Sequence, residues 1–228
     1  MFTLSTDADP GDALAVTARA FDLAGHPGLL LRPRGARALY LFAHGAGAGM
    51  RHPFMAGLSE ALAERGIATL RWELPFMARG GRRVDSPTVS EAAVRQAWLA
   101  APKQLPIFAG GKSFGGRMTS RAHAAEPLPG LRGLIFVGFP LHPDGKPAIE
   151  RAEHLSLAAG PMLFVQGSRD ALAEPRLLRP VIDALGSRAT LHELAGADHG
   201  FTRVKLAEIA DPIATWIDRV LTPDRPRR

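Results

Sequence analysis

The chain has 228 residues, a length that favours one domain with room for a full hydrophobic core. Hydrophobic residues make up 46% of it and charged residues 22%, as in ordinary soluble globular proteins. It contains no cysteine, which excludes disulfides, cysteine-ligated zinc and thiol chemistry. We therefore expect a single domain over residues 1–228, with about 222–228 as a flexible tail.

The net charge of +6 comes mainly from arginine, in two small clusters at residues 79–83 and in the terminal PDRPRR. Nucleic-acid binding requires more extensive basic clusters combined with stacking aromatic residues. No apolar run approaches the roughly 18 residues of a membrane span. The first residues, MFTLSTDADPGDALAV, lack the basic start and apolar block of a secretory signal. We expect a cytoplasmic protein, monomeric or homodimeric, that binds neither nucleic acid nor a membrane.

In chain order, short apolar runs alternate with helix-like stretches. Residues 14–33 resemble two antiparallel edge strands. Further strands are predicted over 38–45, 67–75, 105–111, 131–140, 160–167 and 189–196. Helices are predicted over 52–66, 88–101, 115–126 and 175–186. A last helix is expected to start at Asp211-Pro212, because an N-cap aspartate followed by proline is a helix-start signal.

This alternation predicts an α/β fold with a mostly parallel central sheet flanked by helices and joined by right-handed crossovers. In such sheets, ligands bind outside the carboxyl ends of the strands. Glycine-rich turns that directly follow strands are therefore where chemistry is expected.

The first such turn is HGAGAGM, residues 44–50. Gly45 and Gly47 fit a dinucleotide loop, and Glu73 ends the next strand, but the third glycine position of that motif falls on Met50. The alternative is an oxyanion loop, in which a His-Gly turn directs backbone amides at a developing negative charge. Both interpretations stay open on this stretch alone.

The second turn is FAGGKSFGGRM, residues 108–118. A phosphate-binding loop ending in Gly-Lys-Ser requires a glycine at position 106, where this chain has Pro106. A hydrolase elbow requires Gly-x-Ser-x-Gly between a strand and a helix, and Gly111, Ser113 and Gly115 complete that pattern. The second interpretation fits, with Ser113 as the nucleophile.

Two further loops contain the partners that such a serine needs. Asp170 follows one strand and His199 follows the last strand, although either residue alone is an ordinary turn residue. Serine, acid and histidine occur in the order found in α/β-hydrolases. His199 would take the proton of Ser113, and Asp170 would fix the imidazole tautomer. Asp198 is a weaker candidate for the acid because its neighbouring position makes the far ring nitrogen hard to reach.

These motifs together resemble the α/β-hydrolase superfamily, and within it the small dienelactone-hydrolase-like branch. The resemblance runs from LYLFAHGAGAGM to the terminal helix and includes GKSFGG, QGSRD and GADHGF. Dienelactone hydrolases use a cysteine nucleophile, which this chain lacks, so lactone opening is not implied. The resemblance implies an oxyanion hole made by the backbone N–H groups of Phe114 and Ala46, with Gly47 as the alternative to Ala46.

Only residues 141–160 separate two strands at the point where large hydrolase caps enter, which predicts one short helix and a minimal or absent cap. Candidates for lining the open cleft are Gly45, Gly47, Lys112, Arg71, Glu73 and Phe76. Core packing of Phe76 and a structural ion pair between Arg71 and Glu73 are the alternatives. Lys112 either favours an acidic substrate or pairs with a neighbouring carboxylate.

The sequence thus predicts a serine hydrolase that cleaves a small ester or thioester through an acyl-enzyme on Ser113, without a metal or cofactor. Three alternatives stay open. One is peptide cleavage or acyl transfer on the same triad. Another is a hydrolase fold kept as an interaction module with little turnover. The third is a nucleotide-binding protein that uses GAGAG or GGKS.

Overall fold

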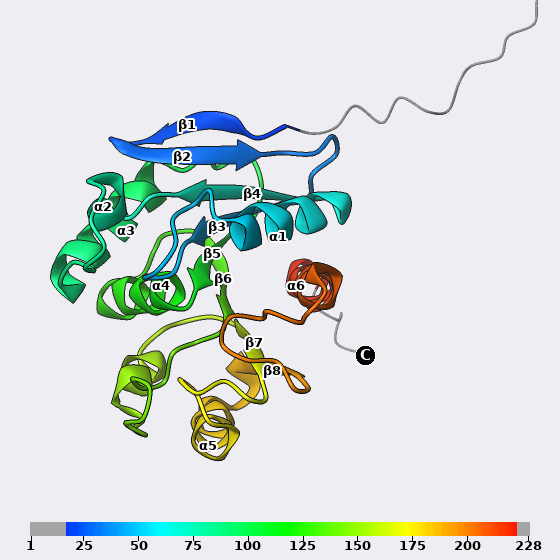
Figure 1. Cartoon of the computed structure of the whole chain (residues 1–228). Helices are drawn as coiled ribbons and strands as arrows, with labels where there is room; N and C mark the ends of the chain where they lie inside the picture. Colours follow the sequence, from blue (N-terminus) through cyan, green and yellow to red (C-terminus); the bar gives the residue numbers. More distant parts are fainter. Residues whose placement is uncertain (1–16, 223–228) are drawn as a thin grey trace, which may run out of the picture.

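The structure, a computed structural model, describes residues 17–222 as one sheet with helices on both faces (Figure 1). The N-terminal stretch 1–16 and all but the first residue of the predicted tail lie outside the described residues. Within residues 17–222, none of the helices is both long and apolar enough to cross a membrane.

The eight strands of the sheet lie in the order β1-β2-β4-β3-β5-β6-β7-β8. Their bounds are β1 Arg19–Leu23, β2 His26–Leu31, β3 Ala38–Ala43, β4 Ile67–Trp72, β5 Ile107–Lys112, β6 Leu131–Val137, β7 Met162–Gly167 and β8 Ala189–Leu194. β2 runs antiparallel to β1 and β4, and the other neighbours are parallel. The mostly parallel sheet and the antiparallel pair at its start are therefore confirmed.

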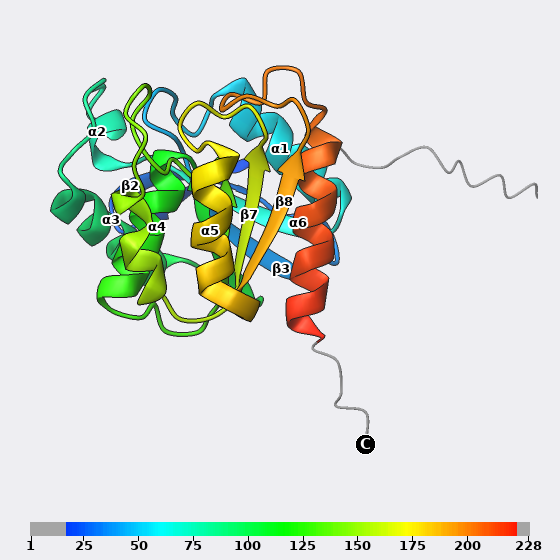
Figure 2. The same ribbon diagram turned by 90° about the horizontal axis from the view of Figure 1, so that it is seen from below.

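The helices form the two outer layers. Their bounds are α1 Pro53–Glu64, α2 Pro75–Ala78, α3 Pro87–Ala100, α4 Phe114–Ala125, α5 Pro175–Leu185 and α6 Leu206–Leu221, with 3-10 turns η1 Glu150–Ser156 and η2 Gly186–Arg188. α1 and α6 lie side by side on one face, and α3, α4 and α5 cover the other (Figures 1 and 2). Because β5 to β8 are parallel, the turns that follow β5, β7 and β8 lie at the same edge of the sheet.

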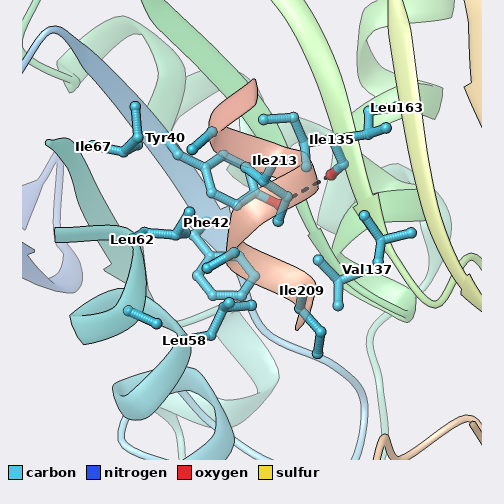
Figure 3. Close-up of a cluster of buried hydrophobic side chains, with 14 of the residues drawn as sticks. Tyr40, Phe42, Leu58, Leu62, Ile67, Ile135, Val137, Leu163, Ile209 and Ile213 are labelled. Carbon is cyan, nitrogen blue, oxygen red and sulfur yellow. Dashed lines mark hydrogen bonds between the residues drawn. The ribbon is translucent and has the colours of Figure 1, made fainter. Parts of the chain in front are cut away.

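Apolar residues of α1 and α6 form the core on their face of the sheet. Leu58 and Leu62 of α1 and Ile213 of α6 pack around Tyr40 of β3, and all four are fully buried (Figure 3). The Tyr40 hydroxyl donates to the carbonyl of Ile135, 3.0 Å away, so its one polar group is satisfied. This core fixes β3 and β6 on either side of β5, the strand that leads to Ser113.

The last helix begins before Asp211, so the predicted start at Asp211-Pro212 is wrong. The Glu208 carboxylate accepts a hydrogen bond from the backbone N–H of Lys205 at 3.0 Å, which caps an earlier turn. Ile209 is fully buried on that turn and anchors it to the core. Pro212 therefore lies inside the helix, where burial of the apolar face outweighs the lost backbone hydrogen bond.

The connection between β6 and β7 contains one 3-10 turn, η1, and no α-helix. This confirms the predicted minimal cap. The carboxyl edge of the sheet is consequently left open above β5 and β6.

A matched pair of leucines tests the core. Leu58 is fully buried in α1, whereas Leu99 of α3 is 72% exposed. Leu58→Ala is expected to lower the free energy of unfolding by about 2–5 kcal/mol, because it leaves a cavity in a packed core. Leu99→Ala, with the same change in helix propensity, should shift it by less than about 0.5 kcal/mol. Urea denaturation measures both, and equal effects would contradict the placement of α1.

Candidate active site

Ser113 occupies a strained turn between β5 and α4. Its backbone is left-handed, with φ 49° and ψ −115°. A methyl group at Gly111 would lie 2.3 Å from the carbonyl oxygen of Ala43, and one at Gly115 would lie 2.4 Å from that of His44. Only glycine allows this close approach of the turn to the β3 end. The elbow motif is therefore required by the local packing, and it leaves Ser113 at the open edge of the sheet.

Ser113, His199 and Asp170 form one hydrogen-bonded chain. His199 Nε2 lies 2.8 Å from Ser113 Oγ, and His199 Nδ1 lies 2.7 Å from Asp170 Oδ2. The three residues follow β5, β8 and β7, which brings loops distant in sequence to one point. Asp170 is 1% exposed, so its carboxylate interacts with His199 away from bulk water.

Gln166 fixes the orientation of the Asp170 carboxylate. Its side-chain amide donates to Asp170 Oδ2 at 2.6 Å, and its own oxygen accepts from the backbone N–H of Phe139 at 2.8 Å. The N–H of Leu172 donates to the other oxygen, Oδ1, at 2.8 Å. Sequence reasoning missed Gln166. The available signal was a polar residue inside the apolar strand MLFVQG, just ahead of the acid loop.

His44 and Glu73 hold the His-Gly loop at its two ends. The buried His44 ring contacts the Gly45 carbonyl through Nδ1 at 2.7 Å and the N–H of Leu74 through Nε2 at 3.0 Å. The same Nε2 lies 3.2 Å from Glu73 Oε2. Glu73 accepts from the N–H of Met50 at 3.0 Å. The loop is thus tied to the end of β4 and is held beside Ser113.

A cavity of about 340 Å³ opens beside Ser113 and His199. Its walls are mainly apolar, and the lining residues are Gly45, Ala46, Gly47, Ala48, His52, Phe54, Met55, Lys112, Ser113, Leu172, His199 and Gly200. A larger hollow of about 560 Å³ lies at the amino ends of β3 and β4, lined in part by Leu39 and Ala68, and is remote from the triad. The smaller cavity is the candidate binding site because the reactive groups open into it.

The predicted oxyanion donors belong to a residue that lines the cavity with Ser113 and to the residue that follows Ser113. Ala46 and its alternative Gly47 line the cavity together with Ser113. Phe114 is the first residue of α4, so its N–H has no acceptor inside the helix and is available to a ligand. The helix N-terminus also favours negative charge at this point. The arrangement suits an anion that forms next to the serine oxygen.

Comparison with known proteins identifies the family. The family model described as an alpha/beta hydrolase domain matches residues 36–216, most of the chain. The chain belongs to the α/β-hydrolase family. The eight-stranded sheet and the open carboxyl edge of this α/β-hydrolase agree with that assignment.

Solved structures share the fold of this α/β-hydrolase. Dienelactone hydrolase from Anabaena variabilis superposes with a TM-score of 0.71 at 22% identity, over 89% of this chain and 96% of that one. A serine hydrolase without a lid from Xanthomonas campestris gives 0.67 at 19% identity, over 92% and 97%. An esterase domain from Rhodothermus marinus gives 0.66 at 18% identity, over 89% and 98%. These likenesses, all below 25% identity, show a shared fold.

The hydrolase fold places three predicted cleft residues elsewhere. Arg71 is 5% exposed and donates to the carbonyl of Met50 at 3.0 Å, and Phe76 is 1% exposed between the rings of His44 and Phe114. The prediction that both line the cleft is wrong, because they pack beneath the His-Gly loop. Glu73 also binds that loop rather than the cavity, and it does so without forming the suggested ion pair with Arg71.

Asp198, the weaker candidate for the acid, and Lys112, which was expected to bind an acidic substrate or a carboxylate, both have other partners. The exposed Asp198 carboxylate binds the hydroxyl of Thr202 at 2.7 Å and its N–H at 3.1 Å, and these bonds lower the pKa of Asp198. It caps the histidine loop, and the His199 ring is bound by Asp170 instead. The Lys112 ammonium donates to the carbonyl of His199 at 2.7 Å, so its hydrogen-bond partner is a backbone oxygen rather than a carboxylate.

The elbow glycines provide a stability test. Gly115→Ala places a methyl 2.4 Å from the His44 carbonyl, whereas Gly47 has nothing within 4 Å of its added methyl. Overpacking of this kind is expected to cost about 1–3 kcal/mol of unfolding free energy for Gly115→Ala. Gly47→Ala should change it by no more than about 0.5 kcal/mol. Denaturant titration of both variants tests this, and a fully stable Gly115→Ala protein would contradict the described elbow.

Proposed function

We propose that the protein is a serine hydrolase that cleaves a small carboxylic ester or thioester through an acyl-enzyme on Ser113. The single observation that carries this proposal is the chain of two hydrogen bonds from Ser113 Oγ through His199 to Asp170, at 2.8 and 2.7 Å. A neutral serine hydroxyl is a weak nucleophile, and such a chain is the arrangement that activates it.

In the acylation step, Ser113 Oγ attacks the carbonyl carbon of the substrate while His199 Nε2 takes the hydroxyl proton. Asp170 accepts from Nδ1–H and stabilises the imidazolium that forms. The carbonyl π electrons move to oxygen, which becomes an oxyanion. When the intermediate collapses, the bond to the leaving group breaks and His199 returns the proton to the departing alcohol or thiol.

Deacylation repeats these steps with water as the nucleophile. His199 Nε2 takes a proton from water, and the resulting hydroxide attacks the acyl carbon. Collapse of the second intermediate breaks the bond to Ser113 Oγ, which regains its proton from His199. The free acid leaves, and the serine is restored.

The backbone N–H groups of Phe114 and Ala46 supply the oxyanion hole in this proposal. Phe114 lies in the first turn of α4, and Ala46 lies in the loop that His44 ties to the end of β4. Donors held in place before the reaction stabilise the transition state without reorganising, and removal of one typically costs about 3 kcal/mol.

The cavity supports a small, mainly apolar acyl group. Ala48, Phe54, Met55 and Leu172 provide apolar walls within about 340 Å³. This volume lies near the lower end of ordinary small-molecule sites. The similarly folded esterase domain from Rhodothermus marinus supports ester chemistry on this scaffold.

Labelling with a fluorophosphonate tests the activated serine. In the wild type, Ser113 Oγ is expected to displace fluoride from the phosphorus of the probe and form a phosphonyl adduct. Ser113→Ala should form no adduct. The matched control is Ser120→Ala, because Ser120 is a buried serine of α4 whose hydroxyl binds His154 instead of His199. An unlabelled wild type would contradict the hydrolase and favour an interaction module.

A p-nitrophenyl ester series of increasing acyl length identifies the acyl preference. We expect kcat/KM to be highest for short chains and to fall once the chain exceeds the cavity. A wild type that is labelled but hydrolyses no ester or thioester, and instead cleaves peptides or transfers acyl groups, would contradict the proposed substrate class. It would leave the activated serine in place.

Substitution of the two aspartates near His199 tests which of them is the acid of the triad. Asp170→Asn removes the charge that binds the His199 ring, and kcat is expected to fall by about 10⁴-fold, as when a triad aspartate is replaced elsewhere. Asp198→Asn alters the exposed cap on Thr202 and leaves the His199 ring bonded to Asp170, so at pH 7 it should change kcat by less than about threefold. Similar losses in both variants would contradict the assignment of Asp170.

A further inference from the structure

We propose that Lys112 is a positioning residue that locks the His199 loop and the His-Gly loop onto the Ser113 elbow. This inference rests on the proposed hydrolase function. Lys112 ends β5 and immediately precedes Ser113, so its side chain starts from the rigid strand that carries the nucleophile. It does not touch the reacting atoms in this account, and it acts through the two loops that it holds.

The ammonium group of Lys112 holds the histidine loop. Nζ donates to the carbonyl oxygen of His199 at 2.7 Å and lies 5.2 Å from the centre of the Phe201 ring. Phe201 itself has a left-handed backbone, with φ 57°, a conformation that a bulky residue adopts only when its surroundings enforce it. The charge of Lys112 thus meets both sides of the turn that carries the His199 ring.

The aliphatic part of Lys112 lies beside the His-Gly loop, and both line the cavity. A methyl placed on Gly45 would lie 3.7 Å from Lys112 Cγ and 3.7 Å from Ser113 Cβ, an ordinary packing distance. On the other side, a methyl on Gly138 would lie 3.1 Å from Lys112 Nζ and 3.5 Å from His199 Cε1. Lys112 therefore lies between the His-Gly loop, the turn after β6 and the histidine ring.

Charge at this position is costly, which argues for a function. Burial lowers the pKa of Lys112 to about 8, although the carboxylates of Asp170 and Asp198 oppose that effect. A methionine of similar shape would avoid the desolvation. Proteins keep such locally unfavourable groups mainly at functional sites. The His199 carbonyl takes one of the three N–H donors of this ammonium, so the contact gives Lys112 a partner that does not depend on a substrate carboxylate.

Lys112→Met tests the positioning role because it keeps an unbranched stem and removes the ammonium. A base displaced by about 1 Å can lose about 100-fold in rate, so we expect kcat to fall by about 10- to 100-fold with KM changed less than about threefold. The thermal midpoint at pH 7 should stay the same or rise, because a buried charge is removed. If Lys112 only stabilised the fold, the Lys112→Met protein would lose thermal stability and activity together.

The pH profile gives a second readout. The groups that face the ammonium are Asp170 from the β7 loop, and Asp198, the His199 carbonyl and the Phe201 ring from the β8 loop, while Gly45 and Gly138 are uncharged. Lys112 is charged below about pH 8 and neutral above it. Wild-type kcat should therefore decline above about pH 8, and this decline should be absent from Lys112→Met.

Chemical rescue makes the test specific, because the chain contains no cysteine. Lys112→Cys introduces a unique thiol. Alkylation with 2-bromoethylamine displaces bromide and rebuilds a lysine-length ammonium, and it should restore at least about a third of wild-type kcat. Alkylation with iodoethane gives a neutral chain of similar size and should not restore it. Mass spectrometry verifies each adduct, and treated wild type is the control for side reactions.

Three results would overturn the proposal: wild-type kcat in Lys112→Met, equal rescue by both alkylating agents, or a loss of activity matched by a loss of thermal stability. Fluorophosphonate labelling of the wild type is measured in the same preparation. A labelled wild type with any of these results overturns the role of Lys112 and leaves the hydrolase intact. An unlabelled wild type overturns the hydrolase and this inference with it.

Discussion

Ser113 adopts a left-handed backbone at the junction of β5 and α4, and this single turn determines which residues can pack around it. Gly111 and Gly115 are needed because the β3 end comes within van der Waals distance of the turn. The close approach in turn brings the His-Gly loop, which follows β3, alongside the serine. The strained backbone of Ser113 is thus held by packing on both sides, and it places the serine at the open edge of the sheet, beside the His-Gly loop and the first turn of α4.

The loops after β7 and β8 complete the site through a series of linked hydrogen bonds. Gln166 binds Asp170 and the Phe139 N–H, Asp170 binds His199, and Lys112 binds the carbonyl of the same histidine. His199 is consequently fixed at both its ring and its backbone. Polar networks of this kind are rigid when every member has a partner, and that rigidity keeps the His199 ring within hydrogen-bonding distance of Ser113.

Local patterns predicted most of the fold, because strand runs, helix signals and glycine turns are short-range features. The order of Ser113, Asp170 and His199 predicted which loops should meet, and the structure brings them together. What failed depends on tertiary packing. The position of Phe76 beneath the His-Gly loop is not encoded in its neighbours. Likewise, Asp211-Pro212 carries a genuine helix-start signal that burial of the preceding turn overrides. The role of Gln166 and the hydrogen-bond partner of Lys112 could not be predicted, because both depend on contacts between different strands and loops.

The most direct measurement of the central claim is the location of the acyl group during turnover. The wild type would be mixed with excess p-nitrophenyl acetate, quenched in acid within milliseconds to seconds and digested with pepsin, and the peptides would be analysed by mass spectrometry. We expect one acetyl group on Ser113, which appears with the first equivalent of nitrophenolate and is absent from Ser113→Ala. Hydrolysis with no adduct at Ser113, or with acetyl on another residue, would contradict it.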